Sequence, residues 1–592
     1  MSDKLQRAKH IREEDSAEAE PFERGRHAGK DRTLSPAHAS SSASQDNADD
    51  RSPESDARDE ERRADLGASA ALISACTIVS RITGFIRTWA MAFALGAGML
   101  SSSYQVANNL PNMLYELVIG GMLVTAFLPV YVSVKKKLGQ SASNEYASNI
   151  LTIVVMFLGI LSVLCVAFPG VAIYTQSFFS DQGDMAQATF FFQFFAIQIV
   201  FYGASAVVSG LLNANHDYFW SSIAPVANNV IVIATFLIYA GLAPSQPEVA
   251  LYIIAIGNPL GVFVQMAMQL PALARNGIRL RPHINWHDPA LRETVAIGLP
   301  TIIVMVMSYI AVSAQNAASL VFTDSGPSVL MYARLWWTLP YSFLVVPITT
   351  TMFTELSELK AEENVEGMKR GIVSGMNQIL FFSVPFMLYL AVFAYPLVSL
   401  LAIGAFTMDD VALIASYLVV LAFALPFYGL KSYFQKVFSS LRKMIAFAVV
   451  DIVATVAQVA FTIGGALLVD YGVDINSVAA GQILFNLLAF LLLLAYLRRE
   501  LGAFGMKSTI RAFVVSLVLG ALGAAAGGGI LWLLQTFVGP LSGSILQSLA
   551  YVVAGGVVSL AVTFGLALKL KVPEAAMLSS IGGRISGKVR RV

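Results

Sequence analysis

Two arginines lie inside the first long apolar stretch of this 592-residue chain, Arg81 and Arg87, in the run SRITGFIR that begins at Ser80. A guanidinium near the centre of a bilayer costs about 2.5–3.5 kcal/mol on insertion scales, so two in one membrane helix need a compensating interaction. A water-filled cavity that binds an anion would supply it, and the planar fork of arginine suits phosphate. Snorkelling to the headgroups and pairing with a buried acid are the alternatives. We expect the cavity.

The next apolar stretch carries a row of polar side chains. Spacings of three and four residues place four of them on one helical face: Gln105, Asn109, Asn112 and Glu116. Asn108 flanks this face, and Pro111 removes one backbone hydrogen bond inside the span. Association between helices would account for one or two amides. A whole polar face instead predicts a cavity wall, because unpaired amides in hydrocarbon are costly.

Three charged residues in later apolar stretches are further candidates. Arg334 lies within about two helical turns of one end of its span, so snorkelling competes with ligand contact. Lys431 lies deeper and is a better ligand candidate. Asp451 either binds a coupling cation or pairs with a lysine. Since these cations outnumber the acids, we expect an anionic substrate, with phosphate or diphosphate as its charged group.

The composition predicts a polytopic membrane protein. Hydrophobic residues make up 56% of the chain and charged residues 13%, with a mean hydropathy of +0.66, whereas soluble domains carry about 25% charged residues. The two cysteines, Cys76 and Cys165, both lie in apolar stretches, so we expect neither a disulfide framework nor a metal site. The sequence shows no Walker A run, nucleophile elbow or catalytic carboxylate pair. A transporter is therefore expected rather than an enzyme, with no cofactor and no nucleic-acid partner.

About 20 apolar residues cross a bilayer, and the expected fold is all-α with about fourteen transmembrane helices. The candidate spans are 67–95, 102–134, 145–174, 186–213, 218–241, 249–273, 292–322, 328–357, 370–402, 411–437, 444–469, 475–497, 510–537 and 545–568. The loops between them alternate in charge. One set contains basic residues such as Lys135, Arg279 and Lys369, and the other has only acids such as Asp409. The positive-inside rule then places both termini in the cytoplasm of a multi-pass protein of the cell membrane.

A faint internal repeat predicts two six-helix lobes. Leu110-Pro111 in the second span and Leu339-Pro340 in the eighth, six spans later, are each followed by a charged loop. The expected organisation has six parts. These are a disordered cytoplasmic tail (1–66), an N-lobe (67–274), a cytoplasmic linker (275–291), a C-lobe (292–500), two appended helices (501–570) and a basic cytoplasmic tail (571–592).

Several motifs resemble the lipid II flippase MurJ (MviN) family, within the MATE-like MOP exporter superfamily. They are SRxxGFxR from Ser80, FxxGAGM from Phe93, NLPNML from Asn109 and GxxxxAFLPV from Gly121. The similarity covers about residues 67–500, and its most specific part is the first two spans. Many members have a basic residue where this chain has Tyr115.

The resemblance implies a V-shaped pair of lobes that flips lipid II, a polyprenyl diphosphate-linked disaccharide-pentapeptide, from the inner to the outer leaflet by alternating access. It implies that Arg81 and Arg87 engage the diphosphate, and that Arg334 approximately matches a third basic residue of the cavity. Cell-wall synthases are implied partners. Candidate driving forces are a Na+ gradient, the membrane potential and consumption of the substrate outside. The sodium ligands of some relatives are not recognisable in this sequence.

Two alternatives stay open at this point. One is export of another polyprenyl-linked glycan or of a drug, although a basic cavity suits a cationic drug poorly. The other is a non-transporting cell-wall scaffold that recruits synthases through residues 1–66; the presence of Arg81 and Arg87 argues against it.

Overall fold

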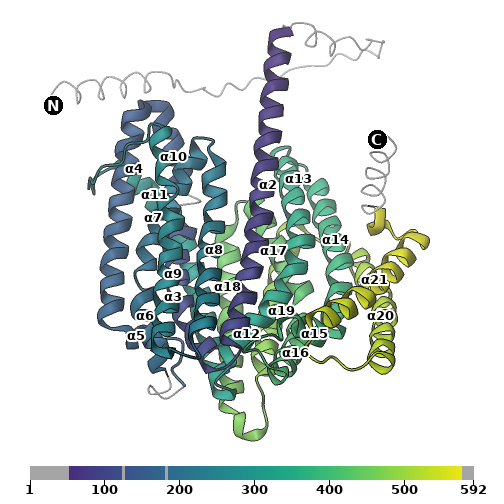
Figure 1. Cartoon of the computed structure of the whole chain (residues 1–592). Helices are drawn as coiled ribbons and strands as arrows, with labels where there is room; N and C mark the ends of the chain where they lie inside the picture. Colours follow the sequence, from purple (N-terminus) through teal and green to yellow (C-terminus); the bar gives the residue numbers. More distant parts are fainter. Residues whose placement is uncertain (1–52, 123–126, 180–184, 577–592) are drawn as a thin grey trace, which may run out of the picture. The chain divides into compact units, whose positions relative to one another are not determined.

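The computed structural model describes residues 53–122, 127–179 and 185–576. Within them, the side chains of 53–71, Ser74, 114–122 and 296–304 lie outside the description. The chain divides into two compact units, Met1–Gly67 and Ala68–Val592. The described helices belong to the second unit, apart from the beginning of one helix (Figure 1).

Every regular element among the described residues is a helix. The first half of the chain contains α2 (Pro53–Leu95), α3 (Met99–Met122), α4 (Leu128–Ala167), α5 (Pro169–Tyr174), α6 (Ala186–Phe195), α7 (Gln198–Ala214), α8 (Tyr218–Leu242), α9 (Pro247–Ala267) and α10 (Leu270–Arg275). The second half contains α11 (Pro289–Phe322), α12 (Gly326–Pro340), η2 (Tyr341–Val345), α13 (Val346–Ala361), α14 (Val365–Val392), α15 (Ala394–Val398), η3 (Ser399–Leu401), α16 (Met408–Ala422), α17 (Leu425–Ser440), α18 (Met444–Leu467), η4 (Val469–Tyr471), α19 (Asn476–Leu501), α20 (Met506–Phe537), α21 (Ile545–Lys569) and η5 (Pro573–Ala575).

The expectation of an all-helical membrane protein is confirmed. Twelve helical segments of the described chain are long and apolar enough to span a membrane, or thirteen if α16 and α17, bent by 51°, form one span. The predicted span 102–134 has no counterpart of its own in this set: its first part lies in α3, a 24-residue helix, and its residues 128–134 belong to α4. The amides of α3 lower its mean hydropathy, so the assignment of α3 as a membrane span stays a prediction.

The start of α2 differs from the prediction of disorder over residues 1–66. The helix begins at Pro53, so the last 14 residues of the predicted tail are helical. This segment is rich in Glu, Arg and Ala, which have good helix propensity, and proline suits the first turn of a helix. The prediction for residues 1–52 lies outside the described residues, and so does that for most of the tail 571–592.

The helices α3, α4 and α6 to α9 form a first helix group. They pack mainly in the pairs α8 with α9, α4 with α7 and α3 with α6. Tyr104 of α3 lies in its core, with its ring centroid 5.2 Å from Phe195 of α6 and 5.4 Å from Phe236 of α8. Such edge-to-face contacts between aromatic rings stabilise the packing of α3, the helix with the polar face, against its neighbours.

The segment between α10 and α11 lies along α4. The backbone amides of Arg281 and Asn285 donate to the side chains of Ser148 (3.1 Å) and Asn149 (2.8 Å) of that helix. The amide of Asn149 in turn donates to the carbonyl oxygen of Asn285 at 2.9 Å. This connection is therefore fixed to the first helix group by its own backbone.

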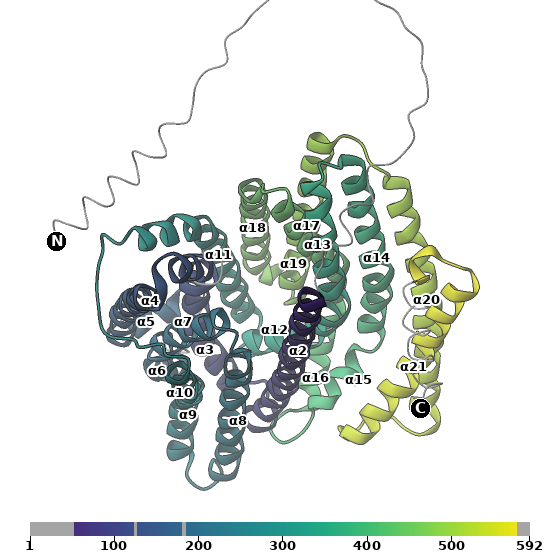
Figure 2. The same ribbon diagram turned by 90° about the horizontal axis from the view of Figure 1, so that it is seen from above.

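The helices α12 to α19 form a second helix group. Its main pairs include α18 with α19, α12 with α16, α14 with α17 and α13 with α14. Phe434 of α17 stacks on Phe490 of α19 with ring centroids 5.5 Å apart. Helix α11 packs against both α3 and α18, and Figure 2 shows α11 between the two groups. The prediction of two lobes at 67–274 and 292–500 accords with this packing and stays a prediction.

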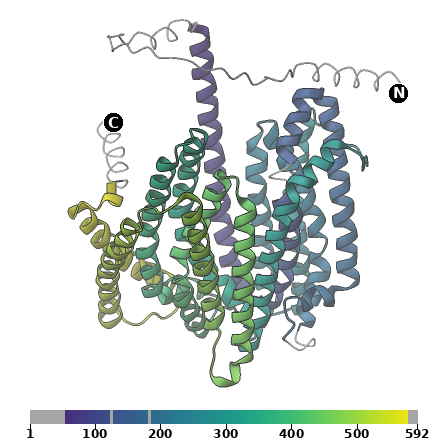
Figure 3. The same cartoon turned by 180° about the vertical axis from the view of Figure 1, so that it is seen from behind.

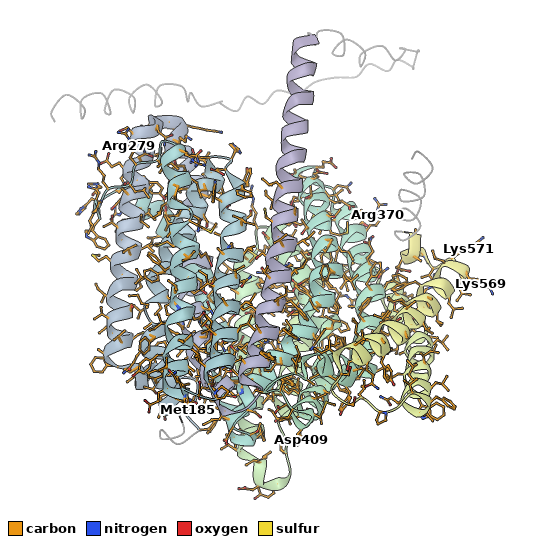
Figure 4. The ribbon with its side chains drawn as sticks, viewed as in Figure 1. Met185, Arg279, Arg370, Asp409, Lys569 and Lys571 are labelled. Atoms are coloured by element: carbon orange, nitrogen blue, oxygen red, sulfur yellow. The ribbon has the colours of Figure 1, made fainter. Side chains whose placement is uncertain are left out.

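Basic and acidic residues lie at opposite ends of the bundle. In Figure 4, Arg279 and Arg370 lie at one end, hereafter the basic end, and Asp409 lies at the other, the acidic end. Figure 3, which views the molecule from behind, shows the hairpin of α18 and α19 extending to the acidic end. The separation follows from the predicted alternation of loop charges, and the side of the membrane that each end faces stays a prediction.

Glycines allow α20 and α21 to pack closely. A Cβ atom on Gly527 of α20 would stand 2.4 Å from the carbonyl oxygen of Gly555 and 2.0 Å from Ser559 Oγ, both in α21. Two residues along the same helix, a Cβ atom on Gly529 would meet nothing within 4 Å. Helix α20 also packs on α14, which joins this hairpin to the second helix group. The glycine-rich stretch is thus a helix–helix contact.

We predict that Gly527→Ala lowers the thermal stability of the purified protein in detergent. The added methyl group collides with a backbone carbonyl, and overpacking of this kind costs about 1–3 kcal/mol. Gly529→Ala is the matched control, and it should be neutral or slightly stabilising because alanine has the better helix propensity. Equal melting temperatures for Gly527→Ala and the wild type would contradict the close contact.

Candidate functional site

A cavity of about 380 Å³ lies where helices of the two groups meet. Helices α2, α3, α8 and α9 supply one wall, and α11 and α12 supply the other. Its charged and amide-bearing lining residues are Arg87, Gln105, Asn108, Asn109, Asn112, Asn258, Gln315, Asn316 and Arg334. The predicted polar face of α3 therefore forms part of a cavity wall.

Arg87 and Arg334 line opposite walls of this cavity. Arg87 stands eight residues before the end of α2 and Arg334 eight residues after the start of α12, so each lies about 12 Å from the acidic end. Arg334 donates from Nη2 to Gln315 Oε1 at 3.2 Å. Among the described residues, neither guanidinium has a carboxylate within ion-pair distance. Both positive charges are therefore uncompensated by the described part of the protein.

Hydrogen bonds orient the amides of the cavity. Asn258 of α9 donates to Asn108 Oδ1 of α3 at 2.6 Å, and Asn112 donates to the carbonyl oxygen of Asn108 at 3.0 Å. On the other wall, Asn316 of α11 donates to Gln176 Oε1 at 2.7 Å. These bonds fix several amides in place, which lowers the entropy cost of holding a polar ligand.

The two helix groups are joined beside the cavity at the acidic end. Tyr332 of α12 donates from Oη to the carbonyl oxygen of Gly96 at 3.0 Å, and Ser102 of α3 donates to Ser328 Oγ at 3.1 Å. The backbone amide of Ala405 donates to the carbonyl oxygen of Phe93 at 3.0 Å. We call these three hydrogen bonds the acidic-end closure.

Two glycines make this closure sterically possible. Gly96 and Gly404 both have φ +66°, a left-handed conformation that favours glycine. A Cβ atom on Gly96 would stand 2.4 Å from the carbonyl oxygen of Ala405, and one on Gly404 would stand 2.3 Å from that of Phe93. The motif FxxGAGM at Phe93 thus lies at the contact between the two helix groups.

The chemistry of the cavity is that of anion binding. Its described lining residues supply guanidinium and amide donors but no carboxylate, histidine or cysteine. A guanidinium can hold two oxygens of one phosphate at once, and amides complement phosphate oxygens or sugar hydroxyls.

Comparison with known proteins identifies the family. The family described as "Lipid II flippase MurJ" matches residues 91–551, more than three quarters of the chain. The chain belongs to the lipid II flippase MurJ family. Membership makes it a membrane transporter rather than an enzyme.

Individual relatives agree with this assignment. The chain is 28% identical over 359 residues to "Probable lipid II flippase MurJ" of Vibrio cholerae serotype O1, covering 58% of this chain and 66% of that protein. It is 22% identical over 397 residues to the protein of the same name from Borreliella burgdorferi, covering 66% and 77%. The chain thus spans just under two thirds of the first relative's length and over three quarters of the second's.

Solved structures share the fold. A structure named "Lipid II flippase MurJ, inward closed conformation" superposes with a TM-score of 0.68 at 20% identity, covering 84% of this chain and 99% of that one. An inward-facing multidrug resistance MATE family transporter of the MOP superfamily superposes with a TM-score of 0.61 at 14% identity, covering 71% and 94%. The fold is therefore the MurJ and MATE fold.

The structure brings four of the predicted site residues together. Arg87, Asn109, Asn112 and Arg334 all line the cavity. Arg81 does not line it: its side chain is exposed, and Nη1 donates to Ser342 Oγ of η2 at 3.0 Å. The helix places these two arginines on different faces, since six residues correspond to a rotation of about 240°. The side chain of Glu116 lies outside the described residues.

Lys431 and Asp451 are paired with each other instead of lining the cavity. Lys431 Nζ lies 2.6 Å from Asp451 Oδ1 and 4.0 Å from the ring centroid of Phe485. The carboxylate is 4% exposed and the lysine 16%. Of the two arrangements considered for Asp451, the structure shows the lysine pair, and it places Lys431 away from the described cavity lining.

The sequence analysis missed an amide of the cavity lining. Asn258 of α9 is 4% exposed and binds the polar face of α3. Its signal was an amide beside Pro259 in the middle of an apolar span, the same pairing of proline and asparagine that stands out in α3. Tyr104 also lines the cavity, from the aromatic core of the first helix group.

We predict that Lys431→Met strongly destabilises the protein, because it leaves the buried Asp451 carboxylate without its cation. Breaking a buried ion pair in this way costs about 3–5 kcal/mol. Lys436→Met, which removes an exposed lysine from the same helix, is the control. The double variant Lys431→Met/Asp451→Asn should regain most of the lost melting temperature and should still transport. A stable double variant without transport would instead assign the Lys431–Asp451 pair a role in transport.

Proposed function

We propose that this chain flips lipid II from the inner to the outer leaflet of the cell membrane by alternating access, and that the cavity between Arg87 and Arg334 holds its diphosphate. The observation that carries the proposal is the pair of guanidiniums without a carboxylate partner among the described residues, in a cavity lined by amides. Membership of the MurJ family supports lipid II as the substrate.

The energetics favour a diphosphate as the ligand. Hydrogen bonds to charged groups contribute about 1.5–3 kcal/mol each, more than neutral ones. Two guanidiniums also repel each other in a site of low dielectric, and a bound dianion would relieve that repulsion. The amides of α3 and α11 would accompany the arginines as donors to phosphate oxygens or to the adjoining sugar.

The size of the cavity argues for more than one state. Small-molecule pockets measure about 300–1,000 Å³, and 380 Å³ is near the lower limit. A disaccharide-pentapeptide is larger than the ligands of such pockets. We therefore assign this cavity to the diphosphate and its neighbouring groups, while a wider state of the protein admits the whole headgroup.

The acidic-end closure is the barrier that a transported headgroup must pass. It consists of three hydrogen bonds, and each contributes about 0.5–1.5 kcal/mol net. The substrate's differential affinity for the open state can offset the loss of these hydrogen bonds.

The charge asymmetry supports an orientation and a driving force. We propose that the basic end and both chain termini face the cytoplasm, following the positive-inside rule. Lipid II then moves outward as an anion. A membrane potential that is negative inside favours this movement by about 2.3 kcal/mol per charge per 100 mV. Asp451 is already paired with Lys431. This pairing favours the membrane potential as the driving force over a sodium ion bound at that carboxylate.

We predict that Arg87→Ala and Arg334→Ala each abolish rescue of cells depleted of their own lipid II flippase. The loss of one charge-assisted hydrogen bond should weaken lipid II binding about tenfold or more in the purified protein. Arg81→Ala should be the milder change, because the Arg81 guanidinium binds Ser342 outside the cavity. Native mass spectrometry with lipid II measures the binding.

The control for this experiment is Arg292→Ala, which removes an exposed arginine near the start of α11. Full rescue by a well-expressed Arg87→Ala/Arg334→Ala double variant would contradict the diphosphate site. Failure of the well-expressed wild type to rescue would point to another polyprenyl-linked glycan.

We predict that a disulfide across the acidic-end closure stops transport. In the variant Ser102→Cys/Ser328→Cys, the two sulfurs replace hydroxyl oxygens that are 3.1 Å apart, so little movement is needed to form the bond. The oxidised variant should lose flipping in reconstituted vesicles, and a reductant should restore it. The two single-cysteine variants are the controls, since the native Cys76 and Cys165 are buried and free. Undiminished flipping by the cross-linked protein would rule out opening at this end.

A further inference from the structure

A second cavity lies at the basic end, away from the substrate cavity. It measures about 580 Å³ and is bounded by the start of α14, the segment that leads into α20, and η5. Figure 4 places Arg370, one of its lining residues, at the same end as Arg279. The amide of Asn377 in α14 donates to Ser508 Oγ in α20 at 2.7 Å and thereby joins the two helices beside the cavity.

The cavity carries one net positive charge. Its three cations are Lys369, Arg370 and Arg511, and its two carboxylates are Glu366 and Glu574. Lys369 is paired with Glu366 at 2.7 Å. Among the described residues, Arg370 and Arg511 have no carboxylate within ion-pair distance. These two guanidiniums, one on α14 and one on α20, are free to bind a common anion.

Hydroxyl and amide donors accompany the guanidiniums. Ser374, Gln378 and Ser508 also line the cavity. Helix α20 is 32 residues long, and no side chain caps its first turn at Gly505. Its N-terminus therefore adds a partial positive charge on the same side. A phosphate in this cavity would meet donors from both helices.

An apolar surface continues from the cavity along α20. Ile510, Val514 and Val518 are 59%, 49% and 54% exposed, and their spacing of four residues places them on one helical face. This face begins one residue before Arg511. A ligand with its anion at Arg511 and a hydrocarbon chain along α20 would match both surfaces.

We propose that this cavity binds the headgroup of an anionic glycerophospholipid. A phosphodiester carries a single negative charge, which matches the single net positive charge of the cavity, whereas a diphosphate carries more. Anionic lipids gather in the cytoplasmic leaflet, and basic pockets between helices on that side bind their headgroups. The bound lipid would connect α14 to α20 and hold the α20–α21 hairpin on the second helix group. The inference does not depend on which substrate the protein transports, but it rests on the proposed orientation of the basic end toward the cytoplasm.

The test measures lipid binding to the purified full-length chain. Native mass spectrometry in detergent would count bound dioleoyl phosphatidylglycerol, with the zwitterionic, net-neutral dioleoyl phosphatidylcholine as the comparison. The cavity variant is Arg370→Gln/Arg511→Gln. The matched control is Lys136→Gln/Lys137→Gln, which removes two exposed cations from α4 in the first helix group. We expect phosphatidylglycerol to bind the cavity variant at least about tenfold more weakly, since each guanidinium contributes a charge-assisted hydrogen bond.

Three outcomes would decide the proposal. Weakened phosphatidylglycerol binding in the cavity variant alone, with an unchanged melting temperature without lipid, supports it. Equal binding by the cavity and control variants overturns it. Displacement of the lipid by glycerol 3-phosphate at similar concentrations would show a site for a soluble anion and would also overturn it. A second readout is the rise in melting temperature on adding phosphatidylglycerol, which the cavity variant should lose and the control should keep.

Discussion

The structure depends on the cost of keeping positive charge inside a membrane protein without a partner. Arg87 and Arg334 lie in a cavity whose described lining holds no carboxylate, so water or a bound anion can compensate their charges. This requirement explains the amide-rich face of α3, which replaces apolar contacts with hydrogen-bond donors. It also explains why α3 is less apolar than a typical span: polar residues replace apolar ones where the helix lines the cavity.

A second constraint is the close approach of backbone to backbone. Gly96 and Gly404 let the two helix groups touch at the acidic end, and Gly527 lets α20 touch α21. The first contact includes three hydrogen bonds beside the cavity, and the proposed alternating access requires it to separate. The second belongs to an appended hairpin, where an added methyl group meets a backbone carbonyl. Glycine thus serves a reversible contact at one place and a permanent one at another.

The sequence predicted the helices well because transfer into a membrane depends on local composition, and the loop charges supplied an independent count. It predicted the polar face of α3 from spacing alone. It assigned both Arg81 and Arg87 to the site, whereas only Arg87 is among the described residues that line the cavity, because the orientation of α2 is set by distant contacts such as those with Ser342 and Asn229. For the same reason Asn258 was missed, and Asp451 stayed undecided between a cation and Lys431. The sequence analysis did not predict the helical start at Pro53. Low hydrophobicity predicts that a segment cannot form a buried core of its own, but a single helix does not need such a core.

The backbone of the segment between α10 and α11 is hydrogen-bonded to Ser148 and Asn149 of α4. This connection therefore moves together with the first helix group and does not act as a flexible linker between the groups. Any rotation of one group against the other must be absorbed farther along, within α11, which packs on both α3 and α18. The stiffness of α11, and not the length of a loop, then limits how far the two helix groups can rotate against each other.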